Sequence, residues 1–152
     1  METVIRKPKE FSADFIRQIV ELLDQGNQIS MKGIEKRLMK ADLIALIVDN
    51  DMVLATACLK NPDPTYKEKV FESAMEDDVA PQFDKELGYI VTRNGFEGQK
   101  LCQKLLSVLI PKISDINLFA TTRNESIIHI LAKFGFSKSG QPYNDGVNLL
   151  LK

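Results

Sequence analysis

The stretch from residue 86 to residue 136 constrains the fold most, because strand-like and helix-like patterns alternate there around a glycine-bearing turn. Residues 86–92 are typical of a strand, residues 93–98 form a turn with two glycines, and residues 99–110 carry leucines at helical spacing. A second strand, residues 117–122, precedes a short helix that ends in a Gly-Phe pair. Backbone amides at a helix N-terminus after such a turn can bind an anion, so the stretch predicts a site for a phosphorylated ligand. The alternative is that the glycines only turn the chain.

The composition narrows the class of protein. A chain of 152 residues suits one domain with an apolar core, so we expect a single domain over residues 1–152. The net charge is −1 and the basic residues are spread along the chain, which argues against nucleic-acid binding. The N-terminal segment has no long apolar run, so we expect neither a signal peptide nor a membrane span. Cys58 and Cys102 lie in apolar segments without metal or redox spacing. We therefore expect reduced, buried thiols, a cytoplasmic location and no metal.

The first half of the chain predicts two helices between strands. Ser12 is placed to cap a helix that stops at Gly26, and Ser30 to cap a second helix that continues to about residue 40. A nearly continuous apolar run is expected to be a buried strand, and it returns as a hairpin through an Asp-Asn-Asp turn. The expected strands here are residues 3–7, 43–48 and 52–59.

The second half contains a long insertion, residues 61–85, with a predicted helix over 66–75 and an acidic loop after it. An insertion of this length is unusual unless it covers a site or is mobile. The chain is expected to end in a strand pair, residues 136–139 and 147–151. This order favours an α/β (mixed α+β) fold, a central mixed sheet with helices on both faces. A doubly wound nucleotide fold is the alternative, but the early hairpin breaks its strand–helix alternation.

Two motifs resemble those of the GNAT superfamily of acetyl-CoA-dependent N-acyltransferases. Residues 97–102 read Glu-Gly-Gln-Lys-Leu-Cys, at the place of the family's Arg-Gly-x-Gly-x-Gly/Ala loop. Residues 118–136 read as the family's second signature: a strand, an Asn, a short helix and a closing Gly-Phe. The chain is most similar to a branch with Ala-Thr-Thr-Arg-Asn at residues 120–124. The resemblance covers nearly the whole chain and implies the GNAT fold, with a β-bulge that opens two parallel strands.

The resemblance also implies an activity and a binding site. A GNAT enzyme is a transferase that moves an acetyl group from acetyl-CoA to a primary amine, here on an unidentified small molecule or protein. Acetyl-CoA is then a cosubstrate, and no metal is implied. Asn124 has a second interpretation, the N-cap of the last helix, and Thr122 with Glu125 offers a competing capping box. The implied cosubstrate contacts are Ile90, Val91, Thr92, Glu97, Gly98, Gln99, Lys100, Leu101, Cys102 and Asn124.

Proton transfer needs a base and an acid. Glu86 opens the strand before the loop, where family members place the carboxylate that takes the amine proton; the alternative is a surface glutamate. The tyrosine that protonates the leaving thiolate in many members is matched here by Leu131. Tyr143, in the predicted loop before the last strand, and Tyr89 are the remaining candidates for the acid, although most tyrosines only pack. His129 is expected to pack or to lie on the surface.

Several residues depart from the family pattern. Glu97 replaces the usual Arg or Gln and is expected to weaken phosphate binding unless it points away or pairs with Arg93 or Lys100. Lys100 and Cys102 stand where the family has small residues. These changes, with Leu131, support an alternative function: a catalytically inactive GNAT-fold module that binds CoA or a protein. A homodimer is compatible with the sequence. The sequence does not identify the acceptor amine.

Overall fold

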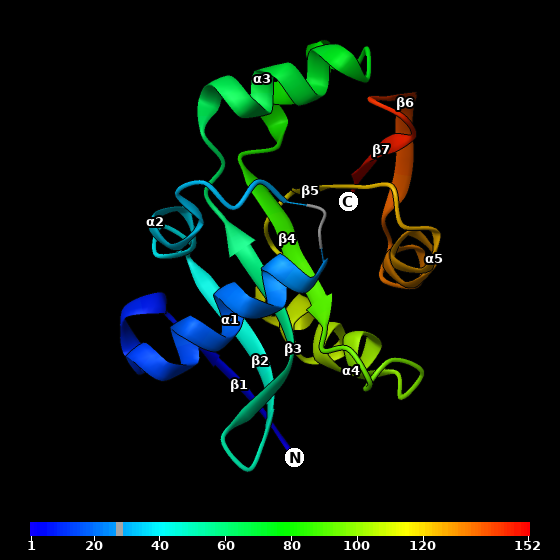
Figure 1. Cartoon of the computed structure of the whole chain (residues 1–152). Coiled ribbons are helices and arrows are strands. Elements are labelled where there is room, and N and C mark those ends of the chain that lie inside the picture. The colour runs from blue at the N-terminus through cyan, green and yellow to red at the C-terminus, as the bar shows by residue number, and fades with distance from the viewer. Residues whose placement is uncertain (27–28) are drawn as a thin grey trace. The chain divides into compact units, whose positions relative to one another are not determined.

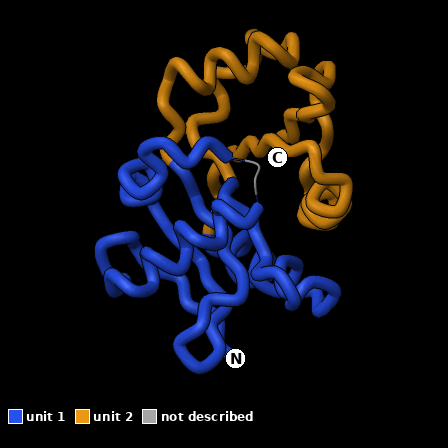
Figure 2. Tube along the Cα trace, in the orientation of Figure 1, with its two compact units in different colours: residues 1–60, 88–112 blue, residues 61–87, 113–152 orange. Residues whose placement is uncertain are grey.

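The computed structural model describes residues 1–26 and 29–152 (Figure 1). The described residues fall into two compact units (Figure 2). Unit 1 contains Met1–Lys60 and Gly88–Lys112, and unit 2 contains Asn61–Leu87 and Ile113–Lys152. The single domain expected from the length stays a prediction. Strand β4, Lys85–Thr92, contributes its first three residues to unit 2 and the rest to unit 1.

The strands of unit 1 follow the order β1-β2-β3-β4. Strand β1 is Glu2–Arg6, β2 is Leu43–Asp49 and β3 is Met52–Lys60, and both β1–β2 and β2–β3 are antiparallel. Asn50 and Asp51 turn the chain in left-handed conformations, with φ of 48° and 64°, which is the hairpin turn that short polar residues favour. The predicted strand and hairpin are therefore confirmed.

Helices cover both faces of this sheet. Helix α1 is Ala13–Gly26 and α4 is Leu101–Leu109, and both contact β3 (Figure 1). Successive strand residues face opposite sides, and every interior residue of β2 and β3 is buried, so neither side is open to solvent. Short 3-10 turns occur at Pro8–Glu10 and Ile110–Ile113.

The starts of the first two helices test the predicted serine N-caps. Ser12 caps α1 as predicted, because its Oγ accepts the amide of Phe15 at 3.2 Å. The Ser30 cap is wrong: helix α2 is only Ile34–Leu38 and begins after Gly33, whose φ is +69°. The carbonyl of Ser30 instead accepts a hydrogen bond from the guanidinium of Arg37.

Unit 2 has the strand order β4-β5-β7-β6. Strand β4 is parallel to β5 (Leu118–Thr122), and β7 (Val147–Leu151) is antiparallel to both β5 and β6 (Ser137–Tyr143). The sheet is mixed, as predicted, and the hairpin of unit 1 excludes the doubly wound alternative. Strand β6 is longer than expected, so Tyr143 ends a strand rather than lying in a loop, a correction to the sequence prediction.

The helices of unit 2 are α3 (Pro64–Ser73) and α5 (Glu125–Lys133), with a 3-10 turn at Asp77–Gln82. Helix α3 starts earlier than predicted, because Asp63 caps it by accepting the amide of Thr65 at 2.8 Å. Phe71 of α3 is fully buried, with ring centroids 6.1 Å from Phe83 and 5.1 Å from Phe119. This aromatic cluster fixes α3 in the core of unit 2. Across the described residues, no helix combines the length and apolarity that crossing a membrane requires.

Candidate functional site

The loop between β4 and α4 has the backbone of an anion site. Gly95 and Gly98 have φ of 91° and 81°, and a Cβ at either position would meet nothing within 4 Å, so the backbone there is open. Helix α4 forms its first hydrogen bond from the Lys104 amide to the Lys100 carbonyl at 2.9 Å. The amides of Leu101 and Cys102 therefore precede the helical ladder, and the Lys100 side chain does not cap them.

Lys100 explains why helix α4 begins two residues later than the sequence predicted. Its φ is +58°, a left-handed conformation that ends the turn and that a glycine would adopt without strain. The small residue of the family pattern matches this backbone requirement. The lysine adopts it at some cost and adds a positive charge at the helix start.

Glu97 has a partner that the sequence did not indicate. Its Oε2 accepts the amide of Gly95 at 2.7 Å, so the carboxylate holds the loop's own backbone. Arg93, considered as its ion-pair partner, instead donates from Nε to the carbonyl of Val53 at 2.7 Å. The carboxylate thus occupies one backbone amide of the loop.

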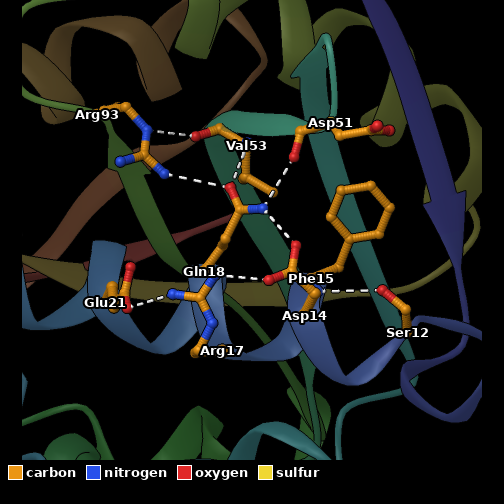
Figure 3. Close-up of polar contacts among 9 residues, drawn as sticks. All are labelled: Ser12, Asp14, Phe15, Arg17, Gln18, Glu21, Asp51, Val53 and Arg93. Atoms are coloured by element: carbon orange, nitrogen blue, oxygen red, sulfur yellow. Dashed lines mark hydrogen bonds and ion pairs between the residues drawn. The ribbon is translucent and has the colours of Figure 1, made fainter.

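A buried glutamine anchors the start of this loop (Figure 3). Gln18 of α1 leaves 8% of its surface exposed, and its Oε1 accepts the amide of Val53 at 2.8 Å. Its Nε2 donates to the carbonyl of Asp51 at 2.8 Å and to Asp14 at 3.0 Å. Arg93 reaches the same Oε1 at 3.4 Å. Helix α1, the β2–β3 turn and the end of β4 are therefore joined by one polar network.

Strand β4 is irregular in its middle. Tyr89 has φ of +52°, which interrupts the regular pleat and supports the β-bulge implied by the resemblance. The Tyr89 ring is buried, and Lys60 Nζ lies 4.2 Å from its centroid, so this tyrosine packs within unit 1. The three residues after it, Ile90, Val91 and Thr92, are half-buried.

Glu86 is not the surface glutamate of the alternative interpretation, because only 2% of it is exposed. Its Oε2 accepts a hydrogen bond from the hydroxyl of Tyr66 at 2.9 Å. The Tyr66 hydroxyl also lies 3.4 Å from Oγ1 of Thr121 on β5. No sequence pattern indicates Tyr66, since it lies 20 positions from Glu86 on the inserted helix α3. The signals that place α3, Asp63 followed by Pro64, were readable; the contact with Glu86 was not.

Two tyrosines lie in the field of the Glu86 carboxylate. Burial, and then the negative charge of Glu86, raise the pKa of Tyr66 well above its usual range. Burial, and to a lesser extent the charge of Glu86, raises the pKa of Tyr143 to about 12. Both hydroxyls are therefore protonated at neutral pH and available as hydrogen-bond donors.

The remaining candidates make local contacts, and the cosubstrate contact of Asn124 stays a prediction. Asn124 is the N-cap of α5: its Oδ1 accepts the amides of Ser126 at 2.9 Å and Ile127 at 3.2 Å, which favours capping over the Thr122–Glu125 box. Leu131 is fully buried, and His129 is exposed.

The cysteines do not offer a nucleophile. Burial raises the pKa of the Cys58 thiol to about 12 and that of Cys102 to about 11, which disfavours the reactive thiolate. Within the described part of the chain, no cluster of His, Cys, Asp and Glu side chains could hold a metal ion.

Comparison with known proteins identifies the fold. No protein-family model and no curated protein matches the sequence. Among solved structures, an acyl-CoA N-acyltransferase from Pseudomonas aeruginosa matches with a TM-score of 0.72 at 12% identity, over 99% of this chain and 98% of that one. Escherichia coli ElaA matches with a TM-score of 0.73 at 17% identity, over 99% and 97%. A GNAT-family acetyltransferase from Streptococcus agalactiae matches with a TM-score of 0.65 at 18% identity, over 98% and 93%. This chain has the GNAT fold.

Proposed function

We propose that this protein is an acyl-CoA-dependent N-acyltransferase that moves an acetyl group from acetyl-CoA to a primary amine. Its structural neighbours include proteins described as acyltransferases and acetyltransferases. The observation that carries the proposal is Glu86, a carboxylate that is 98% buried at the start of β4, the strand that leads into the glycine loop. A buried carboxylate is costly, and such groups occur most often where chemistry needs them.

The glycine loop and the start of α4 suit the pyrophosphate of CoA. Gly98 and the amides of Leu101 and Cys102 supply open backbone donors, and the helix dipole favours negative charge there. Lys100 adds a cation. The amides near Ile90 and Thr92 are proposed to polarise the thioester carbonyl, as the resemblance implies.

Glu86 is proposed as the base for the acceptor. An ammonium group cannot attack a thioester until it loses a proton, and Glu86 would take that proton directly or through a water. The amine nitrogen then bonds to the carbonyl carbon and releases its second proton to water, the carbon–sulfur bond breaks, and the electron pair leaves with the CoA sulfur. Tyr143, with its pKa of about 12, is the proposed proton donor to that sulfur. Transfer of this kind depends mainly on positioning.

The test is thiol release from acetyl-CoA with a panel of polyamines, amino acids and peptides. Glu86→Gln should lower turnover at neutral pH by about a hundredfold or more and leave CoA affinity nearly unchanged. Glu68→Gln, which removes an exposed carboxylate on α3, is the matched control and should behave as wild type. Equal turnover and equal pH–rate profiles for Glu86→Gln and wild type would exclude Glu86 as the base.

One observation favours a second function, a CoA- or protein-binding module without catalysis. Glu97 holds the Gly95 amide at 2.7 Å and places a negative charge in the loop. Calorimetry combined with the thiol-release assay separates the two functions: a CoA-binding module binds acetyl-CoA but releases no thiol with any amine of the panel. Binding together with amine-dependent thiol release would exclude the module.

A further inference from the structure

Tyr66 and Glu86 form the polar centre of unit 2. The Tyr66 hydroxyl lies 2.9 Å from Oε2 of Glu86 and 3.4 Å from Oγ1 of Thr121. A carboxylate can only accept, so the tyrosine donates to Glu86. The Thr121 hydroxyl can then donate to the tyrosine oxygen. The two hydrogen bonds form a chain in which Thr121 donates to Tyr66 and Tyr66 donates to Glu86.

Three contacts tie the start of helix α3 to the start of strand β4. Lys67 Nζ lies 3.3 Å from Oδ1 of Asp84, and Lys85 donates to the side chain of Asn61. The Tyr66 hydrogen bond is the third. The Tyr66–Glu86 hydrogen bond is therefore one of several side-chain contacts between these two segments.

The position of Tyr66 also distinguishes it from a simple core residue. Although its hydroxyl contacts a carboxylate that is only 2% exposed, Tyr66 keeps 38% of its own surface exposed. The side chain thus extends from the surface of α3 to the buried base.

We propose that Tyr66 is the positioning residue of the base: its hydroxyl, oriented by Thr121, holds the Glu86 carboxylate in one rotamer. The inference deepens the proposed function and rests on it for the role of Glu86 in transfer. Proton transfer requires the base to be held in one orientation toward the acceptor, and the Tyr66 hydrogen bond supplies that constraint.

The charged and titratable groups that face this carboxylate come from several elements. Helix α3 supplies Tyr66, and strand β6 supplies Tyr143, whose hydroxyl is coupled to the charge of Glu86. Strand β5 supplies Thr121, which does not titrate. On its own strand, Lys85 neighbours Glu86 in sequence and bonds to Asn61.

The experiment compares wild type with Tyr66→Phe, which removes the hydroxyl and keeps the ring. At neutral pH kcat should fall by about tenfold or more, with little change in the KM for acetyl-CoA. Thr121→Val should lower kcat by less, and should add nothing in the Tyr66→Phe background. Glu68→Gln is the control for a change on α3.

A second measurement needs no activity. The carboxyl carbon of Glu86 is followed at neutral pH by carbon NMR of glutamate-labelled protein, with the signal assigned by its loss in Glu86→Gln. Its chemical shift should differ between Tyr66→Phe and wild type, because the variant lacks the hydrogen bond to this carboxylate. An unchanged signal together with an unchanged kcat would overturn the inference and leave the acyltransferase function standing. If wild type transfers no acetyl group to any amine, the proposed function fails, and the NMR signal alone decides whether Tyr66 holds the Glu86 carboxylate.

Discussion

Gly140 of β6 lies against the end of helix α3 so closely that a Cβ there would stand 2.0 Å from the carbonyl oxygen of Ala74. The same carbonyl accepts the amide of Gln141 at 2.9 Å, and Gln141 Nε2 donates to the carbonyl of Ser73 at 3.3 Å. These contacts fix the C-terminal end of α3, just as the contacts to β4 fix its start. The helix that carries Tyr66 is thus held at both ends within unit 2.

Gly140→Ala should destabilise the protein by about 2–4 kcal/mol, because the new methyl group meets backbone and the residue's φ is +69°. Urea denaturation measures the loss. Gly146→Ala is the matched control: its φ of +97° is also positive, and less favourable for alanine than that of Gly140, but a Cβ there meets nothing within 4 Å. The control should therefore lose only about 1 kcal/mol. Equal losses for both variants would mean that α3 moves aside without cost.

Glu97→Gln tests the effect of the loop carboxylate. The amide oxygen of glutamine can still accept the Gly95 amide, so the change removes the charge and keeps the contact. Affinity for CoA should rise by about two- to fivefold at low salt, and the gain should shrink as salt screens the repulsion. Isothermal titration calorimetry at two ionic strengths measures it. Weaker binding by Glu97→Gln would mean that the loop is built for a ligand without phosphate groups.

Gly98→Pro tests whether the loop donates its backbone to the ligand. Proline removes the amide of residue 98 and cannot adopt the observed φ of +81°, so CoA affinity should fall by about tenfold or more. Gly98→Ala is the control, since a Cβ there meets nothing within 4 Å and the amide remains. Both affinities are measured by calorimetry, with circular dichroism to verify folding. Equal affinities for the two variants would place the phosphate site elsewhere.

Local signals predicted the parts of the fold that local physics controls. Ser12 caps α1 because its hydroxyl reaches an amide three residues away, and the polar turn at Asn50 closes the first hairpin by its own conformation. The prediction for Ser30 failed because Arg37, seven residues further on, takes its carbonyl. The periodicity of a helix does not report such competition.

In the candidate site, too, residues placed by local signals were predicted and contacts between distant residues were not. Glu86 was predicted because it occupies a recognisable place in a strand and motif. Its partner Tyr66 was not, since that contact exists only when α3 docks through Phe71 and Gly140. Glu97 was noticed for its charge, but its bond to Gly95 depends on loop backbone angles that no sequence pattern specifies.

Gln18→Leu should destabilise the protein by about 1–3 kcal/mol. The amide of Val53 and the carbonyl of Asp51 would lose their buried side-chain partner, and leucine offers neither a donor nor an acceptor. Gln25→Leu, on the same helix, is the matched control: its side chain is exposed and accepts the Asn94 amide at 3.4 Å, so the expected change is within about 0.5 kcal/mol.

Urea denaturation of both variants, compared with wild type, measures the difference. The Gln18 network also holds Arg93 at the start of the glycine loop, so Gln18→Leu should weaken CoA binding as well as the fold. If the variant loses stability but binds CoA as wild type does, the network is structural only, and Arg93 holds the loop through the Val53 carbonyl without help from Gln18. If its stability is unchanged, water replaces the glutamine, and the three elements joined there do not depend on it.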